Sequence, residues 1–288
     1  MSKALAVPPA GPARIAPGEQ TASAPGDRTA AAIRLSALVV ARNEESRIAG
    51  CLESLAFADE IVVVLDRCTD GTEAVARRYT SRIHLGSWER EGDRRNLGID
   101  ACRGAWIFEL DADEVATPAL INAVNAAIAA DAYDIFDIPV HNYVGDRLVL
   151  NGWMAAIGTN FAARLFRKGA KTWGPERVHP HLDIKGRRGP VLEAALVHRV
   201  AHDISGLLRK LDRNTTWRAL DLVERGQVGR FPSAVRKIPS RFWKCFVARK
   251  GWREGGYGFV IALCAALYPV LSHLKATLDA PRGALAGK

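Results

Sequence analysis

The chain has 288 residues, 48% of them hydrophobic and 25% charged, which excludes a disordered chain and allows one α/β domain with an appendage. Its five cysteines are dispersed without a Cys-x-x-Cys pair, which argues against a disulfide framework or a cysteine zinc site and indicates reduced thiols in the cytosol. The net charge of +9 arises from residues 201–288, where 16 Lys and Arg face 6 Asp and Glu, so we expect an anionic partner there.

The first 32 residues are rich in Ala, Pro, Gly and Ser and show no apolar period, which predicts a disordered leader. Pro8, Pro9 and Pro12 interrupt any apolar run after Lys3, so a secretory signal is not expected.

From about residue 33 the pattern alternates between strands and helices. The expected strands cover residues 35–41, 61–65, 83–85 and 105–108, and the expected helices cover 48–55, 72–79, 94–101 and 118–130. This order predicts an α/β fold with a doubly wound, mostly parallel, Rossmann-like sheet. No glycine fingerprint of a dinucleotide-binding fold follows the first strand, which counts against a dehydrogenase. Residues 133–200 are irregular and β-rich, and the chain becomes helical again beyond Asp203.

A cluster of carboxylates at residues 109–114 directly follows the apolar strand 105–108. Asp111 and Asp113 share strand parity, so their side chains point the same way if the strand continues. Two such charges repel unless a cation sits between them, and Mg²⁺ binds one or two carboxylates together with substrate phosphates. The cluster therefore predicts a metal clamp for a nucleotide diphosphate, and a solvated loop start is the alternative.

Other polar residues also follow the predicted strands. Asp66 ends a buried strand and is expected to bind a base or ribose, whereas Asp70 is expected to form a turn and helix cap. Arg94, Arg95 and Asn96 precede the third helix. They form either a solvated face or a source of positive charge for a diphosphate.

Five motifs in order, at residues 43–45, 60–66, 69–72, 95–96 and 110–114, resemble family 2 glycosyltransferases of the GT-A fold. The likeness is strongest over residues 35–120. Within the family it is closest to the bacterial branch that adds β-linked glucose or a similar sugar to the lipopolysaccharide core. This resemblance implies an inverting hexosyltransferase with a nucleotide-sugar donor such as UDP-glucose. It also implies a GT-A domain over residues 33–200, with donor half 33–120 and acceptor half 121–200.

The resemblance also implies roles for single residues of the donor half. Asn43 and Glu44 match the first nucleotide-contact segment, and Asp66 matches the carboxylate that meets uracil or ribose. Arg95 and Asn96 match the segment beside the donor.

The same resemblance makes Asp111 and Asp113 the metal motif for Mg²⁺ or Mn²⁺, with Asp113 the direct ligand. Glu176 is the first choice for the general base and His179 the second, because Pro180 stands where related chains often carry an acidic residue. A loop with charged residues and a packing histidine is the alternative.

Basic and aromatic residues alternate over 236–253, and residues 255–274 contain no charged side chain. This combination suits an anionic bilayer surface better than nucleic acid, and no nucleic acid is expected. An interfacial or re-entrant helix ranks first, a buried core helix second and a true span third. Residues 201–288 are thus predicted to form a helical, basic, membrane-associating region of a cytoplasmic enzyme on the inner membrane, with a glycan or glycolipid acceptor.

Two other functions remain open. A polyprenyl-phosphate glycosyltransferase would share the donor half and transfer the sugar to a lipid phosphate. A non-catalytic basic protein that binds nucleic acid or anionic lipid would not need carboxylates at three strand ends.

Overall fold

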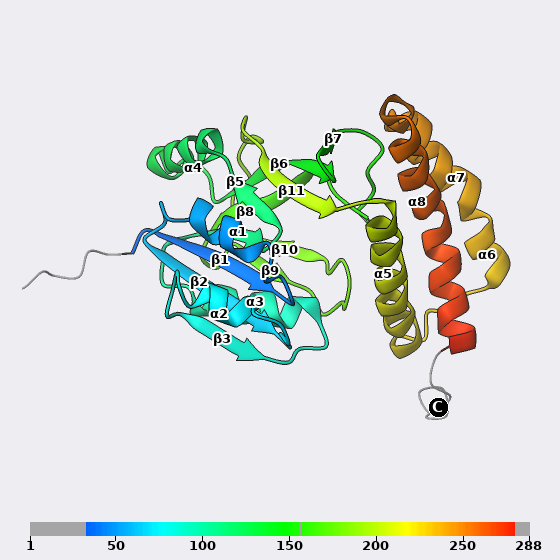
Figure 1. Ribbon diagram of the computed structural model, residues 1–288, viewed down its shortest axis with the longest axis horizontal. Coiled ribbons are helices and arrows are strands. Elements are labelled where there is room, and N and C mark those ends of the chain that lie inside the picture. Colours follow the sequence, from blue (N-terminus) through cyan, green and yellow to red (C-terminus); the bar gives the residue numbers. More distant parts are fainter. Residues whose placement is uncertain (1–32, 156, 280–288) are drawn as a thin grey trace, which may run out of the picture. The chain divides into compact units, whose positions relative to one another are not determined.

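The computed structural model describes residues 33–155 and 157–279, and the chain from Ile33 onward forms one compact unit (Figure 1). The predicted leader, residues 1–32, lies outside the described residues.

The first half of the sheet is parallel. Its strands are β1 (Leu35–Ala41), β2 (Glu60–Asp66), β3 (Ile83–Gly86) and β4 (Trp106–Asp111), in the spatial order β3-β2-β1-β4. They are connected by α1 (Ile48–Ser54), α2 (Thr72–Ala76) and α3 (Glu91–Ala101). Every residue of β1 is buried, and all but Ser36 are apolar, as expected of a strand covered on both faces.

The sheet continues beyond β4 with mixed strand directions. Its further strands are β8 (Phe161–Arg167), β6 (Ile135–Val144), β11 (Leu196–Ala201) and β5 (Glu114–Ala116), with β7 (Arg147–Val149) paired to β6. Helix α4 (Pro118–Ala130) follows β5, and β9 (Lys171–Trp173) and β10 (Leu182–Ile184) form a separate ribbon. The predicted α/β class with a mostly parallel sheet is confirmed, with the parallel pairing concentrated in the first half.

Local chemistry explains where several helices begin and how closely they pack. The Thr117 side chain accepts a hydrogen bond from the Leu120 amide at the start of α4, and Pro118 occupies the first turn. Gly98 brings α3 close to the sheet, because a Cβ there would lie 2.5 Å from Leu38 Cδ1. The close approach of α3 carries the arginines of its first turns toward the end of β4.

The C-terminal part consists of helices that pack against one another (Figure 1). They are α5 (Ile204–Glu224), α6 (Phe231–Val235), α7 (Lys237–Trp243) and α8 (Gly256–Leu274), with short turns η1 (Lys244–Ala248), η2 (Gly251–Glu254) and η3 (Lys275–Asp279). Asp203 caps α5 by accepting a hydrogen bond from the Gly206 amide at 2.6 Å.

Helix α8 with its continuation to Asp279 is long and apolar enough to cross a bilayer, but 56% of its most apolar window is buried against protein. Ile261, Cys264 and Tyr268 form a core with α5, which is the packing that the core-helix alternative requires. Phe259 and Leu263 remain 50% and 41% exposed, so the same helix presents an apolar edge to its surroundings.

Candidate active site

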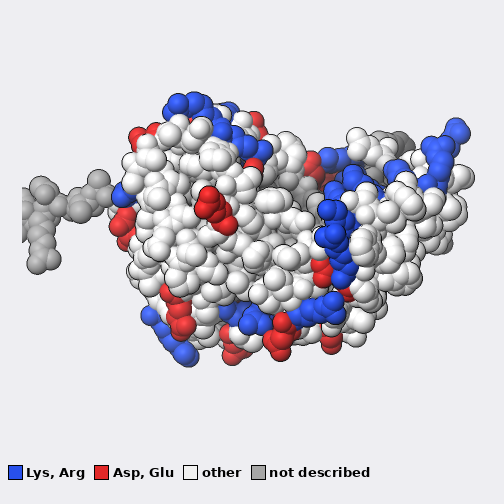
Figure 2. Space-filling view, turned by 90° about the horizontal axis from the view of Figure 1, so that it is seen from above, with Lys and Arg blue, Asp and Glu red and all other residues white. Residues whose placement is uncertain are grey.

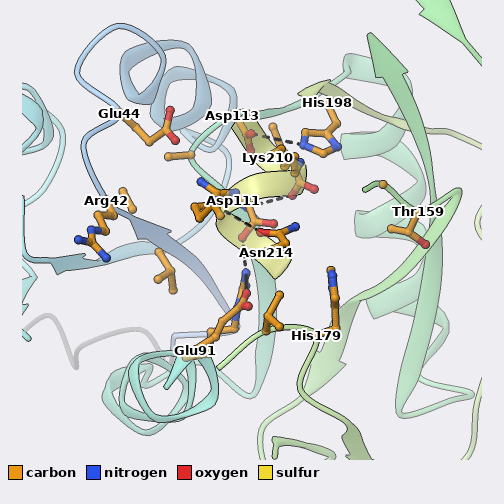
Figure 3. A pocket seen from close by; sticks show the side chains of 18 of the residues that line it. Arg42, Glu44, Glu91, Asp111, Asp113, Thr159, His179, His198, Lys210 and Asn214 are labelled. Carbon is orange, nitrogen blue, oxygen red and sulfur yellow. Dashed lines mark hydrogen bonds and ion pairs between the residues drawn. The ribbon is translucent and has the colours of Figure 1, made fainter. Parts of the chain in front are cut away.

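A cavity of about 620 Å³ opens where the ends of β1 and β4 face α5 (Figure 3). Ligands of open α/β sheets bind at this carboxyl edge of the strands. The lining includes Asn43 and Glu44 after β1, and Asp111 and Asp113 at and after β4. Arg95 lines the cavity as well, so the structure brings together five of the residues that the sequence predicted for the donor and the metal.

Asp111 and Asp113 reach the cavity by a different route from the predicted one. Strand β4 ends at Asp111, and a turn follows at residues 112–113. The Glu114 carboxylate accepts a hydrogen bond from the Asp111 amide at 2.9 Å, which closes this turn. The turn, rather than continued strand alternation, therefore places both aspartates in the cavity.

The Asp111 carboxylate is held between two arginines. Its Oδ1 lies 2.6 Å from Arg95 Nη2, and its Oδ2 lies 2.7 Å from Arg164 Nη2. Burial acts to raise the pKa of Asp111, but the charges of Arg164 and Arg95 outweigh it and hold the pKa well below its usual range. Arg164 also pairs with Glu114. Asp111 is therefore an ionised part of a fixed network.

A second layer of buried charges supports this network. Glu109 lies 2.6 Å from Arg95 Nη1 and 2.7 Å from Lys171 Nζ, and it is fully buried. Burial alone would raise the pKa of Glu109, but Lys171 and Arg95 lower it to about 2. Burial lowers the pKa of Lys171 to about 8. Because each buried charge has partners, the layer fixes the Arg95 guanidinium that faces Asp111.

Asp113 faces a histidine whose tautomer is defined by its neighbours. Asn142 Nδ2 donates to the Thr159 carbonyl at 2.8 Å, which turns Asn142 Oδ1 toward His198 Nδ1, also at 2.8 Å. An amide oxygen only accepts hydrogen bonds, so Nδ1 of His198 carries a proton. In the neutral imidazole Nε2 is then an acceptor, and it lies 3.4 Å from Asp113 Oδ2 (Figure 3). A metal ion bound between these two atoms would be a partner for both of them.

This arrangement fits a divalent cation. The donors are a carboxylate and an imidazole nitrogen whose other nitrogen is fixed by a hydrogen bond, a common arrangement for metal-binding histidines. Within residues 33–155 and 157–279, no group of three or more His, Cys, Asp or Glu side chains forms a complete metal cage. Substrate phosphates normally complete the shell of Mg²⁺, so two protein ligands suffice.

Glu44 lies on the opposite wall of the cavity from Thr159 (Figure 3). Burial, together with the nearby charge of Asp113, raises the pKa of Glu44 to about 7. Asn43 adopts a positive φ of 54° and accepts a hydrogen bond from the Thr69 amide at 2.8 Å, which ties the β1 loop to the β2 loop.

Two predicted donor residues lie outside the cavity lining. Asp66 ends β2 and is 1% exposed, with its carboxylate bound by Arg67, by Arg94 and by the Trp88 amide. Asn96 exchanges two hydrogen bonds of 2.9 Å with the backbone of Trp173. In this structure Asp66 orients Arg94, which lines the cavity, and Asn96 anchors β9 to α3.

The two candidates for the general base lie in different places. His179 lines the cavity and has a positive φ of 52°, an uncommon backbone conformation for a non-glycine residue. Glu176 does not line it, and its carboxylate binds His181 and Arg225. Burial acts to raise the pKa of Glu176, but the hydrogen bonds from His181 and Arg225 outweigh it and lower the pKa to about 2. The geometry therefore favours the second choice of the sequence prediction over the first.

The sequence prediction missed several lining residues. Helix α5 contributes Lys210, Arg213, Asn214 and Trp217, which recur at i, i+3, i+4 and i+7 and therefore share one helix face. This spacing is visible in the sequence, but a polar face usually points to solvent. His198 and Arg164 were also missed, because nothing near them in the sequence marks them.

The fold and the cavity define a glycosyltransferase of the GT-A type, a class that uses nucleotide-sugar donors. The model of the family "Glycosyl transferase family 2" matches residues 36–194, and the chain belongs to this family. The resemblance seen in the sequence and the predicted enzyme class are confirmed.

The chain is similar to several known proteins. The lipopolysaccharide core biosynthesis glycosyltransferase LpsC of Rhizobium meliloti is 26% identical over 254 residues, which cover 84% of this chain and 91% of that protein. Among solved structures, S. aureus TarS in complex with UDP-GlcNAc gives a TM-score of 0.44 at 14% identity, covering 65% of this chain and 66% of that chain. Glucosyl-3-phosphoglycerate synthase from Mycobacterium tuberculosis, in complex with Mn²⁺ and UDP-glucose, gives 0.33 at 20% identity, covering 39% and 45%.

Proposed function

We propose that the protein is an inverting, metal-dependent hexosyltransferase that uses UDP-glucose or a similar UDP-sugar. Its acceptor is a hydroxyl group of the lipopolysaccharide core or of another cell-envelope glycolipid. The convergence of Asp113 and His198 at the sheet edge is the observation that carries the donor half of this proposal. The similarity to LpsC supports the acceptor class.

Asp113 and His198 would hold the cation, because both oxygens of Asp111 are already bound by arginines. Once bound, Mg²⁺ or Mn²⁺ would neutralise charge on the departing nucleoside diphosphate. Arg94 and Lys210, which also line the cavity, supply further positive charge for the diphosphate.

The reaction exchanges one bond at the anomeric carbon of the sugar. The acceptor oxygen bonds to that carbon from the face opposite the diphosphate, the bond to the diphosphate breaks, and the configuration inverts. The acceptor hydroxyl loses its proton to a base on the cavity wall. His179 is our first candidate for this base because it lines the cavity, and Glu176 is the second.

The donor half is tested by thermal unfolding with UDP, with and without Mn²⁺. UDP at a hundred times its dissociation constant should add about 2.7 kcal/mol of stability when the metal is present. Asp113→Ala should abolish this gain, while the control Asp146→Ala, at a fully exposed carboxylate, should keep it. If no uridine nucleotide stabilises the wild type with any divalent metal, the proposal fails. Assays with lipopolysaccharide-core and polyprenyl-phosphate acceptors separate the two transferase alternatives.

We also propose that the C-terminal helices rest on the cytoplasmic face of the inner membrane, by peripheral or re-entrant association. Figure 2 shows Lys and Arg side chains over this part of the molecule. Trp243 and Trp252 are 64% and 54% exposed and are followed by the basic residues Lys244 and Arg253. Aromatic and basic side chains together suit an anionic lipid surface.

Co-sedimentation with anionic and neutral vesicles tests this association. Trp243→Ala/Trp252→Ala should weaken binding to anionic vesicles, and the control Phe161→Ala, at an exposed aromatic residue on β8, should not. Equal vesicle binding by the double variant and the wild type would contradict the proposed orientation.

A further inference from the structure

A second cavity, of about 250 Å³, lies among α5, α6, α7 and α8. Its lining contains no carboxylate and four basic residues, which come from α5, α7 and the loop between α5 and α6: Arg218, Arg230, Lys237 and Arg241. Ser233 and Gln227 add neutral polar groups. Four cations around one small cavity repel each other, so an anion bound there would relieve the repulsion.

None of these four basic side chains forms an ion pair or a hydrogen bond within the described parts of the chain, 33–155 and 157–279. The nearby carboxylate of Asp221 is 1% exposed and already accepts hydrogen bonds from the Arg177 amide and guanidinium. The Asp221 carboxylate is therefore paired with Arg177 and does not balance the charge of the second cavity. The four basic side chains of the second cavity therefore have no charged partner among the described residues.

The wall of the second cavity also carries polar groups with fixed orientations. His273 is 7% exposed, and its Nδ1 lies 3.1 Å from the Val228 carbonyl, so Nδ1 is the protonated nitrogen. The Ser272 hydroxyl donates to the Tyr268 carbonyl at 2.7 Å. These bonds fix the wall behind the arginine and lysine side chains.

The two cavities share a wall. Trp217 lines the first cavity, and its neighbour on α5, Arg218, lines the second. His179 of the first cavity packs against Tyr268 of the second, with ring centroids 6.4 Å apart. The two cavities therefore lie next to each other, separated by α5 and by the His179–Tyr268 contact.

We propose that the second cavity binds a phosphomonoester group carried by the sugar acceptor. Three arginines favour phosphate, because guanidinium groups bind its oxygens in pairs and the dianion matches several cations. The assignment of this phosphate to the sugar acceptor rests on the function proposed above, whereas phosphate binding by the second cavity does not. The phosphate belongs either to a soluble phosphorylated sugar or to a lipid headgroup, and the shared chemistry is the same.

Calorimetric titration tests the site with glucose 6-phosphate, and co-sedimentation tests it with phosphatidylcholine vesicles that contain or lack phosphatidic acid. Arg230→Gln/Lys237→Gln should weaken phosphomonoester binding about ten- to a hundredfold. The control Lys185→Gln/Arg209→Gln removes the same charge at exposed residues that line neither cavity, and it should bind as the wild type does. Loss confined to glucose 6-phosphate identifies a soluble source, and loss confined to phosphatidic acid identifies a lipid headgroup.

Two further measurements separate this site from the donor cavity. Saturating UDP with Mn²⁺ should not displace glucose 6-phosphate, and the double variant should keep its stabilisation by UDP and Mn²⁺. Displacement by UDP would place the phosphate in the donor cavity and overturn the inference. Equal binding of both phosphate probes by the double variant and the control would overturn it as well. Failure of UDP to stabilise the wild type would count against the donor proposal alone.

Discussion

The two cavities differ in how their charges are balanced. In the donor cavity six Lys and Arg meet five Asp and Glu, and Asp111 is paired on both oxygens. In the second cavity four cations meet no carboxylate. Charges that pair with each other become part of the folded framework, whereas charges without partners remain available to a ligand. Substitutions of the paired charges around Asp111 should therefore change stability, and substitutions of the unpaired cations in the second cavity should change binding.

The largest effect is expected for Arg164→Met. Burial raises the pKa of Glu114, and Arg164 is the cation that holds it beside Asp111. Without this cation the buried carboxylate of Glu114 faces the half-buried carboxylate of Asp111, so we expect a loss of about 3–5 kcal/mol in the free energy of unfolding at neutral pH. Urea denaturation measures it. A loss no larger than that of an exposed control, Arg209→Met, would show that the pairs are not structural.

Asn142→Ala should lower the affinity for the metal, although Asn142 is not one of the proposed ligands. Asn142 fixes the His198 tautomer, so its loss leaves Nε2 free to carry the proton. We expect Mn²⁺ affinity in the presence of UDP to fall about 10- to 100-fold, measured by titration. Asn125→Ala, on the exposed face of α4, is the matched control. Unchanged affinity would remove His198 from the proposed metal site.

Glu176→Gln tests the choice of base through the pH dependence of activity. A carboxyl group with a pKa of about 2 is ionised at every pH at which activity is measured, so it cannot produce an acidic limb near neutrality. We expect the acidic limb of kcat to stay in place. The lowered pKa also means that Glu176 contributes stability above its unfolded pKa, which is lost as pH falls toward 2. A displaced limb would make Glu176 the base after all.

The smallest effect on stability is expected for Arg230→Gln. This side chain forms no ion pair within the described residues, so its removal should change the free energy of unfolding by no more than about 0.5 kcal/mol. Any gain should shrink as salt is added, because salt screens the repulsion among the four cations. Chemical denaturation at low and high salt measures both. A clear loss of stability would mean that the second cavity is part of the framework.

The donor half was predictable because its signals are local. The apolar runs at β1, β2 and β4 identify buried strands, and polar residues directly after them must reach the same sheet edge. Strand parity, which predicted that Asp111 and Asp113 point the same way, was nevertheless not what orients them. The turn closed by the hydrogen bond from the Asp111 amide to Glu114 does so. Glu176 was predicted to be the general base from its neighbourhood in the sequence. In the structure its carboxylate pairs instead with His181 and Arg225.

The sequence by itself determined the strands of the parallel half, the family and the carboxylates at the strand ends, because each depends on residues that are close together in the chain. The tertiary structure decided which distant residues complete the sites. His198 meets Asp113 only because β11 pairs with β5, which follows the Asp113 turn. The second cavity exists only because α5, α6, α7 and α8 pack together, so its four cations, spread over residues 218–241, become neighbours in space. Side-chain pairing across such separations follows from packing, and no local pattern encodes it.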